Sequence, residues 1–169
     1  KDGETYFLAT EYVEGENLRQ RSARGQLTVP DVLDLTVQIV AALHAAHAAH
    51  IIHRDIKPDN VMVRHDGIVK VLDFGLAKLV EQVQQDNALP LQKQQVSLTQ
   101  RGAIIGTVAY MSPEQARGQA VDACTDLFSV GVMLYELLTG RQPFTGETVS
   151  HTIVAILEKD PPPITEQSI

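Results

Sequence analysis

The chain has 169 residues and a mass of 18.5 kDa, which is the usual length of one globular domain. Apolar residues make up 44 % and charged residues 21 %, which excludes a wholly disordered chain. The net charge of −7 argues against a nucleic-acid-binding protein, because phosphate contacts need clustered basic side chains. The single cysteine, Cys124, excludes an intramolecular disulfide and a zinc site built on several cysteines.

The first half of the chain predicts a strand, two helices and a hairpin. Aromatic and β-branched residues over 5–13 predict the strand. A short helix is expected near 17–24. A long helix is expected over 29–50, because Thr28 and Asp31 form a capping box and apolar residues then recur at helical spacing.

The β-hairpin is predicted from two short apolar runs, at 61–63 and 68–72. They are joined by His65-Asp66-Gly67, and Asp-Gly between apolar runs is a strong hairpin signal. Residues 81–101 are rich in Gln and have no period, so they predict a mobile loop.

Three helices are predicted in the second half. Ser112-Pro113-x-Gln115 indicates a capped start. The apolar run at 127–138 predicts a core helix buried on all sides and ended by Gly140. A membrane span needs roughly 18–20 apolar residues, so this run predicts no membrane segment within the chain. The last helix is expected over 147–159.

The predicted hairpin carries the residues with the clearest chemistry. Asn60 begins the hairpin and Asp73 follows it, so an antiparallel return brings them together as oxygen ligands for a hard cation such as Mg²⁺. Asp55 lies in the same loop and can accept a hydrogen bond from an incoming hydroxyl. Lys57 adds a positive charge where phosphate charge needs stabilising.

These residues belong to a longer ordered set of motifs. The set comprises His53-Arg54-Asp55, Lys57-Pro58-x-Asn60, Asp73-Phe74-Gly75, Gly106-Thr107-x-x-Tyr110, Ser112-Pro113-Glu114 and Asp126. In order and spacing it resembles the eukaryotic-type (Hanks-type) Ser/Thr protein kinases, and it is most similar to their bacterial members. The resemblance implies an α+β fold of the protein-kinase type. That fold has a mostly helical large lobe, a catalytic β-hairpin and the last strand of the small lobe.

The resemblance implies catalytic roles for four residues. Asp55 resembles the catalytic base and Lys57 the lysine that contacts the transferring phosphate. Asn60 and Asp73 resemble the ligands of Mg²⁺, or of Mn²⁺ in its place. Structural roles fall to a further set of residues: His53, Arg54, Phe74, Gly75, Glu114 and Asp126.

The resemblance also implies a nucleotide site. Glu11 to Val13 match the hinge, whose backbone groups bond adenine, and Thr10 falls at the gatekeeper position. Leu18 and Met62 match the apolar floor under the adenine, and Asn17 is assigned to the same site.

Regulation is predicted in the long loop between the metal-binding motif and the Pro-Glu motif. Arg54 matches an arginine that helps to hold a phosphorylated activation loop. Thr99 is the predicted autophosphorylation site and Ser97 the second choice. Thr107 matches a residue that bonds the catalytic Asp55 and Lys57 and completes the peptide-binding site.

The match implies a partial kinase domain over 1–169. Residues 1–13 correspond to the last small-lobe strand and hinge, and 14–169 to the large lobe, truncated after about residue 159. The Gly-rich loop and the ATP-binding lysine are absent from this chain. The isolated chain is therefore expected to be inactive.

The expected function is ATP-dependent phosphorylation of Ser or Thr in protein substrates, in the cytoplasm, with autophosphorylation between two copies of a homodimer. Two alternatives stay open. A pseudokinase or scaffold would keep this fold without transfer, if the lysine outside the chain were altered. A small-molecule phosphotransferase shares the Asp-x-x-x-x-Asn pattern, but it lacks the Gly-Thr-x-x-Tyr and Pro-Glu segment that is present here.

Overall fold

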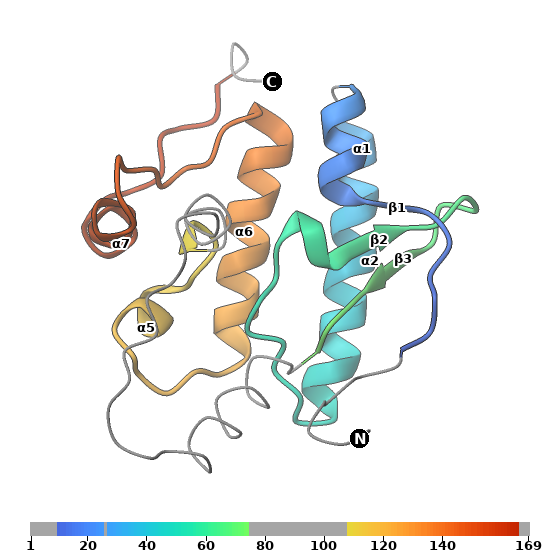
Figure 1. Ribbon diagram of the computed structural model, residues 1–169, viewed down its shortest axis with the longest axis horizontal. Coiled ribbons are helices and arrows are strands. Elements are labelled where there is room, and N and C mark those ends of the chain that lie inside the picture. The colour runs from blue at the N-terminus through green and yellow to red at the C-terminus, as the bar shows by residue number, and fades with distance from the viewer. Residues whose placement is uncertain (1–9, 26, 75–107, 166–169) are drawn as a thin grey trace, which may run out of the picture.

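A computed structural model describes residues 10–25, 27–74 and 108–165 (Figure 1). These residues form an α+β fold with a three-stranded antiparallel sheet in the order β1-β2-β3. The elements in chain order are β1 (Glu16–Asn17), α1 (Leu18–Arg24), α2 (Val29–Ala48), the single-turn 3₁₀ helix η1 (Pro58–Asn60), β2 (Val61–Val63), β3 (Val69–Val71), α5 (Pro113–Ala116), α6 (Ala123–Thr139) and α7 (Val149–Glu158).

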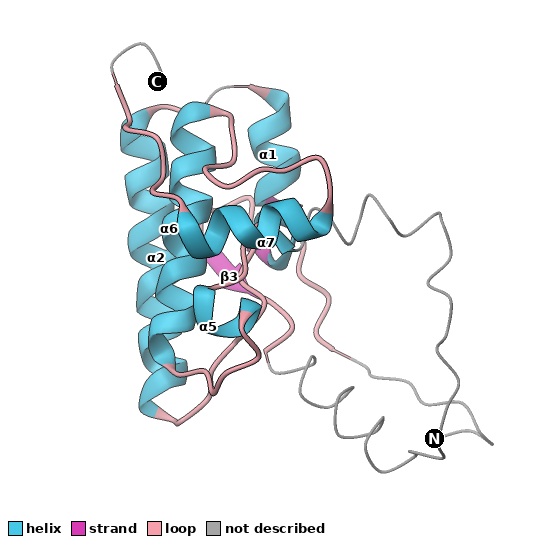
Figure 2. Cartoon of the chain, turned by 90° about the vertical axis from the view of Figure 1, so that its left-hand side faces the viewer, coloured by secondary structure: helices cyan, strands magenta, loops and turns pink. Residues whose placement is uncertain are grey.

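The helix α2 organises the interior. Its buried stripe of Val32, Leu35, Ile39 and Leu43 packs against β3 and α6. By length and composition alone, α2 is the one helix among the described residues that could cross a membrane. The stripe nevertheless belongs to the hydrophobic core of this fold, as expected for a core helix. The helices α5 and α7 lie on the other side of α6 (Figures 1 and 2).

The helix starts follow local capping chemistry. The capping boxes predicted at Thr28 with Asp31 and at Ser112 with Gln115 are both present. Helix α6 ends at Gly140, whose φ of 68° is the left-handed value that glycine adopts without strain. The predicted hairpin is confirmed, with Val61 opposite Val71 and Val63 opposite Val69.

The prediction of a strand over 5–13 is wrong for residues 10–13, which form no strand; residues 5–9 lie outside the described part of the chain. Pairing with the hairpin begins later, where Glu16 lies opposite Val63. Gly15 allows this approach, because a Cβ at that position would lie 2.3 Å from the carbonyl oxygen of Val63. Strand formation needs a partner, and the described residues place none beside 10–13.

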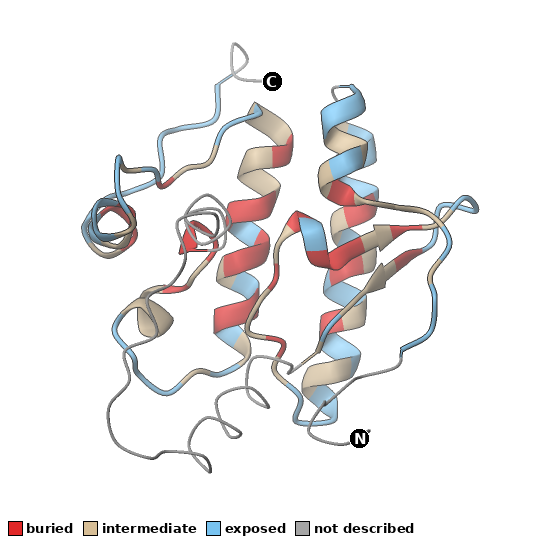
Figure 3. Ribbon diagram, viewed as in Figure 1, coloured by how far each residue is buried: buried red, intermediate tan, exposed pale blue. Residues whose placement is uncertain are grey.

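The prediction that α6 is buried on all sides is also wrong. Seven of its residues are buried, from Thr125 to Leu137, but Leu127 remains 50 % exposed and Gly131 is exposed as well (Figure 3). Neighbouring elements cover the face with the seven buried residues and leave Leu127 and Gly131, one turn apart, exposed. An apolar composition therefore identified a core helix but overestimated how much of it is covered.

Candidate active site

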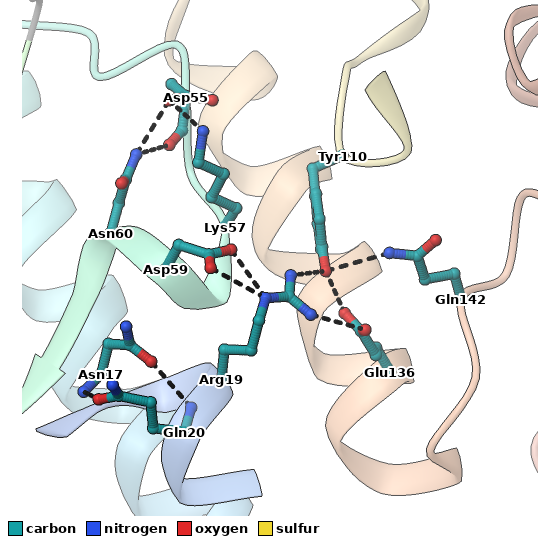
Figure 4. Close-up of polar contacts among 10 residues, drawn as sticks. All are labelled: Asn17, Arg19, Gln20, Asp55, Lys57, Asp59, Asn60, Tyr110, Glu136 and Gln142. Carbon is teal, nitrogen blue, oxygen red and sulfur yellow. Dashed lines mark hydrogen bonds and ion pairs between the residues drawn. The ribbon is translucent and has the colours of Figure 1, made fainter. Parts of the chain in front are cut away.

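The turn that contains η1 gathers three polar side chains (Figure 4). Lys57 Nζ donates to Asp55 Oδ2 at 2.8 Å, and Asn60 Nδ2 donates to the same oxygen at 2.9 Å. Asn60 Nδ2 also donates to the backbone oxygen of Asp55, at 2.8 Å. Two donors thus orient the Asp55 carboxylate through Oδ2, and Oδ1 takes no part in these bonds.

A buried carboxylate in α6 holds the backbone in front of Asp55. Asp126 is fully buried and accepts hydrogen bonds from the backbone nitrogens of His53, at 2.9 Å, and Arg54, at 2.8 Å. His47 Nε2 lies 2.7 Å from Asp126 Oδ2. These bonds hold Arg54 at a φ of 72°, which is uncommon for a residue with a side chain.

The turn at 53–60 is named the catalytic turn after the predicted roles of its residues. His53 connects this turn to the chain that leads to Asp73. Its Nε2 donates to the backbone oxygen of Leu72 at 2.6 Å, while its Nδ1 accepts from the backbone nitrogen of Asp55 at 3.2 Å. These two bonds select the neutral tautomer with the proton on Nε2. The ring also packs edge-on against Phe74, with 4.7 Å between the ring centroids.

The two predicted metal ligands lie at adjacent ends of the hairpin. The backbone nitrogen of Leu72, the residue before Asp73, donates to the backbone oxygen of Asn60 at 2.8 Å. Because Nδ2 of Asn60 is bonded to Asp55, the amide presents Oδ1 as its remaining ligand atom. Asp73 is exposed. An amide oxygen and an accessible carboxylate suit Mg²⁺, which completes its coordination with water and phosphate oxygens.

No cluster of three or more His, Cys, Asp or Glu side chains suited to a metal occurs among the described residues. Asn60 and Asp73 would supply one amide oxygen and one carboxylate to a cation. Water and phosphate oxygens commonly complete the coordination of Mg²⁺ at such a site.

A hollow of about 520 Å³ lies between the segment 10–13 and the hairpin. Its lining includes the predicted hinge residues and Met62, and it reaches Asp73. Leu18, the other residue predicted to lie under the adenine, is fully buried in the core and is not among the lining residues of this hollow. The Asn17 side chain caps α1 by accepting from the backbone nitrogen of Gln20 at 2.8 Å, and Asn17 is not among the lining residues.

One ion pair connects the two walls of this hollow. Lys70 Nζ lies 2.7 and 2.8 Å from the two carboxylate oxygens of Glu11. This hydrogen bond and the charge of Lys70 lower the pKa of Glu11. A second hollow, of about 320 Å³, includes the β2–β3 turn and Glu14 in its lining, but none of the catalytic residues.

Sequence reasoning missed a polar network centred on Arg19 (Figure 4). Arg19 Nε lies 3.0 and 2.9 Å from the Asp59 carboxylate oxygens, and Arg19 Nη2 donates to the Tyr110 hydroxyl at 2.9 Å. The Tyr110 hydroxyl donates to Glu136 and accepts from Gln142 Nε2 at 3.2 Å. One donor and two acceptor positions complete the hydrogen-bonding capacity of this phenol.

The network shifts two pKa values. Burial, followed by the hydrogen bond to Glu136, raises the pKa of Tyr110 to about 12. Burial disfavours the charge of Arg19, but hydrogen bonds from the guanidinium to Asp59 and Tyr110 prevail and raise its pKa. The members of the network come from α1, η1, the segment before α5, α6 and the loop after α6. No local sequence pattern could have assembled them.

The predicted structural residue Glu114 lies in the first turn of α5. Glu114 Oε1 accepts from Thr125 Oγ1 at 2.6 Å, which lowers the pKa of Glu114 and joins α5 to the start of α6. Gly75, Ser97, Thr99 and Thr107 lie outside the described residues, so their roles stay predictions.

Comparison with known proteins agrees with this geometry. The family model described as protein kinase domain matches residues 1–166. The chain belongs to the protein kinase domain family. Members of this family use ATP and a divalent metal ion.

Similar proteins include several bacterial kinases. A probable serine/threonine-protein kinase of Streptomyces coelicolor is 44 % identical over 84 % of this chain and 20 % of its own length. The serine/threonine-protein kinase PknL of Mycobacterium tuberculosis is 40 % identical over 96 % of this chain and 38 % of its own. The serine/threonine-protein kinase PrkC of Bacillus subtilis is 36 % identical over 96 % and 23 %. The chain thus spans less than half the length of these relatives.

Proposed function

We propose that this chain is the catalytic part of an ATP-dependent Ser/Thr protein kinase that transfers the γ-phosphate of ATP to protein hydroxyls. One observation carries the proposal: Lys57 Nζ and Asn60 Nδ2 both donate hydrogen bonds to Oδ2 of Asp55. The sequence Lys57-Pro58 after the aspartate supports a Ser/Thr rather than a tyrosine substrate. The names of the bacterial relatives support the same class.

In the proposed reaction, Asp55 orients the substrate hydroxyl and receives its proton, with Oδ1 as the accepting atom. The hydroxyl oxygen forms a bond to the γ-phosphorus as the bond from that phosphorus to the β,γ-bridging oxygen breaks, and ADP leaves with the electron pair. Lys57 Nζ lies beside Asp55, and its positive charge offsets the negative charge of the phosphoryl group during transfer. Because both side chains are held before substrate arrives, positioning is the main contribution of the protein.

The metal site would use Asn60 Oδ1 and the Asp73 carboxylate, with Mg²⁺ as the preferred ion and Mn²⁺ as an alternative. The ion would neutralise charge on the ATP phosphates. The hinge backbone from Glu11 to Val13 and the side chain of Met62 would contact the base of ATP in the 520 Å³ hollow. The acidic charge of the chain makes nucleic acid an unsuitable partner.

Substitutions in the full-length protein test the proposal, with phosphate transfer to a protein substrate and binding of Mg·ATP measured separately. Asp55→Asn should reduce transfer by at least about 100-fold with little change in ATP binding, because it removes a base. Asp73→Asn should weaken both, because it removes a metal ligand. Asp66→Asn is the control, because it removes the same negative charge from an exposed residue in the hairpin turn.

Each result has a distinct meaning. Near-native transfer by both variants would contradict the assigned roles. If the wild-type protein bound Mg·ATP but transferred no phosphate to any protein, the pseudokinase alternative would replace the proposal.

Regulation and location follow as part of the same proposal. Autophosphorylation at Thr99, or at Ser97, would take place between two copies in the cytoplasm, with Arg54 pairing to the new phosphate. Thr99→Ala combined with Ser97→Ala should then lower activity well below that of the wild type. Phosphopeptide mapping that found both residues unmodified in fully active protein would contradict this mechanism.

A further inference from the structure

The oxygen and the nitrogen of the Gln115 side-chain amide form hydrogen bonds with two different segments of the chain. Gln115 Oε1 accepts from the backbone nitrogen of Ser112 at 3.0 Å, which completes the capping box at the start of α5. Gln115 Nε2 donates to the backbone oxygen of Arg54 at 2.7 Å, across 61 positions of sequence. The capping box accounts for the first bond and leaves the second unexplained.

The second bond acts on the peptide unit that leads into Asp55. The oxygen of this unit belongs to Arg54 and is held by Gln115, while its N–H belongs to Asp55 and donates to His53 Nδ1 at 3.2 Å. Arg54 N is itself bonded to Asp126 Oδ1 at 2.8 Å. Three side chains, Gln115 of α5, Asp126 of α6 and the neighbouring His53, therefore fix the peptide planes on both sides of Arg54, which has a φ of 72°.

The other capping boxes in the fold show that this long-range bond is not a requirement of capping. In α1, Gln20 caps through Oε1, which accepts from the backbone nitrogen of Asn17 at 3.1 Å, while Gln20 itself is exposed. In α2, the same position is taken by Asp31, which has no donor to offer. A carboxylate can therefore replace Gln115 in the cap, but it cannot donate to Arg54 unless it is protonated.

We propose that Gln115 is a positioning residue for Asp55, joining the start of α5 to the peptide unit of Arg54 and so fixing the direction of the catalytic carboxylate. This proposal rests on the proposed function of Asp55. Through Gln115, any rearrangement of the Ser112-Pro113-Glu114 segment would reach the catalytic turn directly. The geometry does not require Gln115 to contact either substrate.

The decisive variant is Gln115→Glu in the full-length protein. It keeps the capping acceptor but places a carboxylate against the Arg54 oxygen, so kcat at pH 8 should fall about tenfold. At lower pH the carboxyl group takes up a proton and regains a donor. The ratio of kcat between the variant and the wild type should therefore rise as the pH falls from 8 to 5.5. Loss of capping alone would not produce such a rise.

Two further variants complete the design. Gln119→Glu adds the same charge at an exposed position four residues away, and its kcat ratio should stay near one at every pH. Gln115→Met removes both bonds, and its kcat ratio should be low but independent of pH. A cavity of about 30 Å³, roughly the room for one water, has Gln115 and Arg54 in its lining, so a solvent molecule can partly restore the lost bond in this variant.

Hydrogen exchange of the backbone over 52–57 tests the proposal without reference to catalysis. Protection of these amides should fall in Gln115→Glu and Gln115→Met at pH 8 but not in Gln119→Glu. Unchanged exchange together with a kcat ratio above one half for Gln115→Glu at pH 8 would overturn the proposal. A wild-type protein without transfer activity would defeat the proposed function instead, and the exchange result would still decide the role of Gln115.

Discussion

The catalytic turn and the hinge segment both contact the hairpin, yet they are held in very different ways. The turn at 53–60 is fixed by fully buried groups, Asp126 and His53, and by a chain of short hydrogen bonds. The predicted hinge at 11–13 is mostly exposed, with Tyr12 at 88 %, and an ion pair joins its Glu11 to Lys70 of the hairpin. The fold concentrates its buried polar groups where the orientation of Asp55 is decided.

This difference has an energetic consequence. Leaving a buried donor without its acceptor costs about 1–3 kcal/mol, whereas an exposed ion pair contributes about 0–1 kcal/mol. In the proposed reaction, phosphate transfer depends on the direction of the Asp55 carboxylate, whereas the hinge would offer backbone groups to the flat base of ATP. We therefore expect rigidity around the proposed reacting atoms and tolerance of movement in the proposed nucleotide wall.

The largest expected loss of stability comes from removing the buried carboxylate that holds the catalytic turn. Asp126→Ala leaves the backbone nitrogens of His53 and Arg54 without their buried acceptor and should lower the free energy of unfolding by about 3 kcal/mol. Asp122→Ala, which removes the exposed cap of the same helix, should cost about 1 kcal/mol. Urea unfolding measures both values. Equal losses in the two variants would show that the buried anchor has no special role.

The Arg19 network should give an intermediate effect. Arg19→Met leaves Asp59 and Glu136 without their cation, but because these groups are partly exposed we expect a loss of only about 1–2 kcal/mol. Arg24→Met, which removes a 77 % exposed partner of Glu16, should cost less than about 0.5 kcal/mol. Urea unfolding of both variants measures this difference. A larger loss for Arg24→Met would contradict the ranking by burial.

The contribution of Tyr110 to stability should depend on pH. Its pKa is raised from 10.0 to about 12 in the folded protein, so the folded state resists ionisation. The stability due to the neutral phenol is complete below about pH 10 and is lost as the pH rises from 10 to 12. The difference in unfolding free energy between the wild type and Tyr110→Phe should therefore change in this window. A difference that stayed constant up to pH 12 would indicate an unshifted phenol.

The smallest effect is expected at the hinge. Lys70→Met and Glu11→Gln should each change the affinity for Mg·ATP by no more than about fivefold, and the change should shrink as salt is added. Because the Lys70 partner lowers the pKa of Glu11, the pair is complete above the ordinary pKa of glutamate and is lost as the pH falls through the lowered value. Equilibrium binding with the reversed pair, Glu11→Lys with Lys70→Glu, should restore the wild-type affinity. A loss of affinity larger than the effect of Asp73→Asn would contradict the view that the hinge tolerates movement.

Features that depend on near neighbours in the chain could be predicted from the sequence. Capping boxes span three positions, so Thr28 with Asp31 and Ser112 with Gln115 could be recognised from their spacing alone. The hairpin followed from two apolar runs and an Asp-Gly turn, and the ordered motifs around Asp55 and Asp73 indicated the family. Local geometry decides these features, because the interacting groups are held together by the chain itself.

The tertiary structure alone decided what depends on groups far apart in the chain. It placed Leu18 in the core, left 10–13 without a strand partner among the described residues, exposed Leu127 and assembled the network around Arg19. It also gave Gln115 a second partner 61 residues away. In the folded chain, a side chain can contact residues from many distant segments. The periodicity of apolar residues and the spacing of motifs in the sequence do not show which of these residues come within hydrogen-bonding distance. The residues of the catalytic turn could therefore be predicted from their motif, whereas the contacts that hold them in place could not.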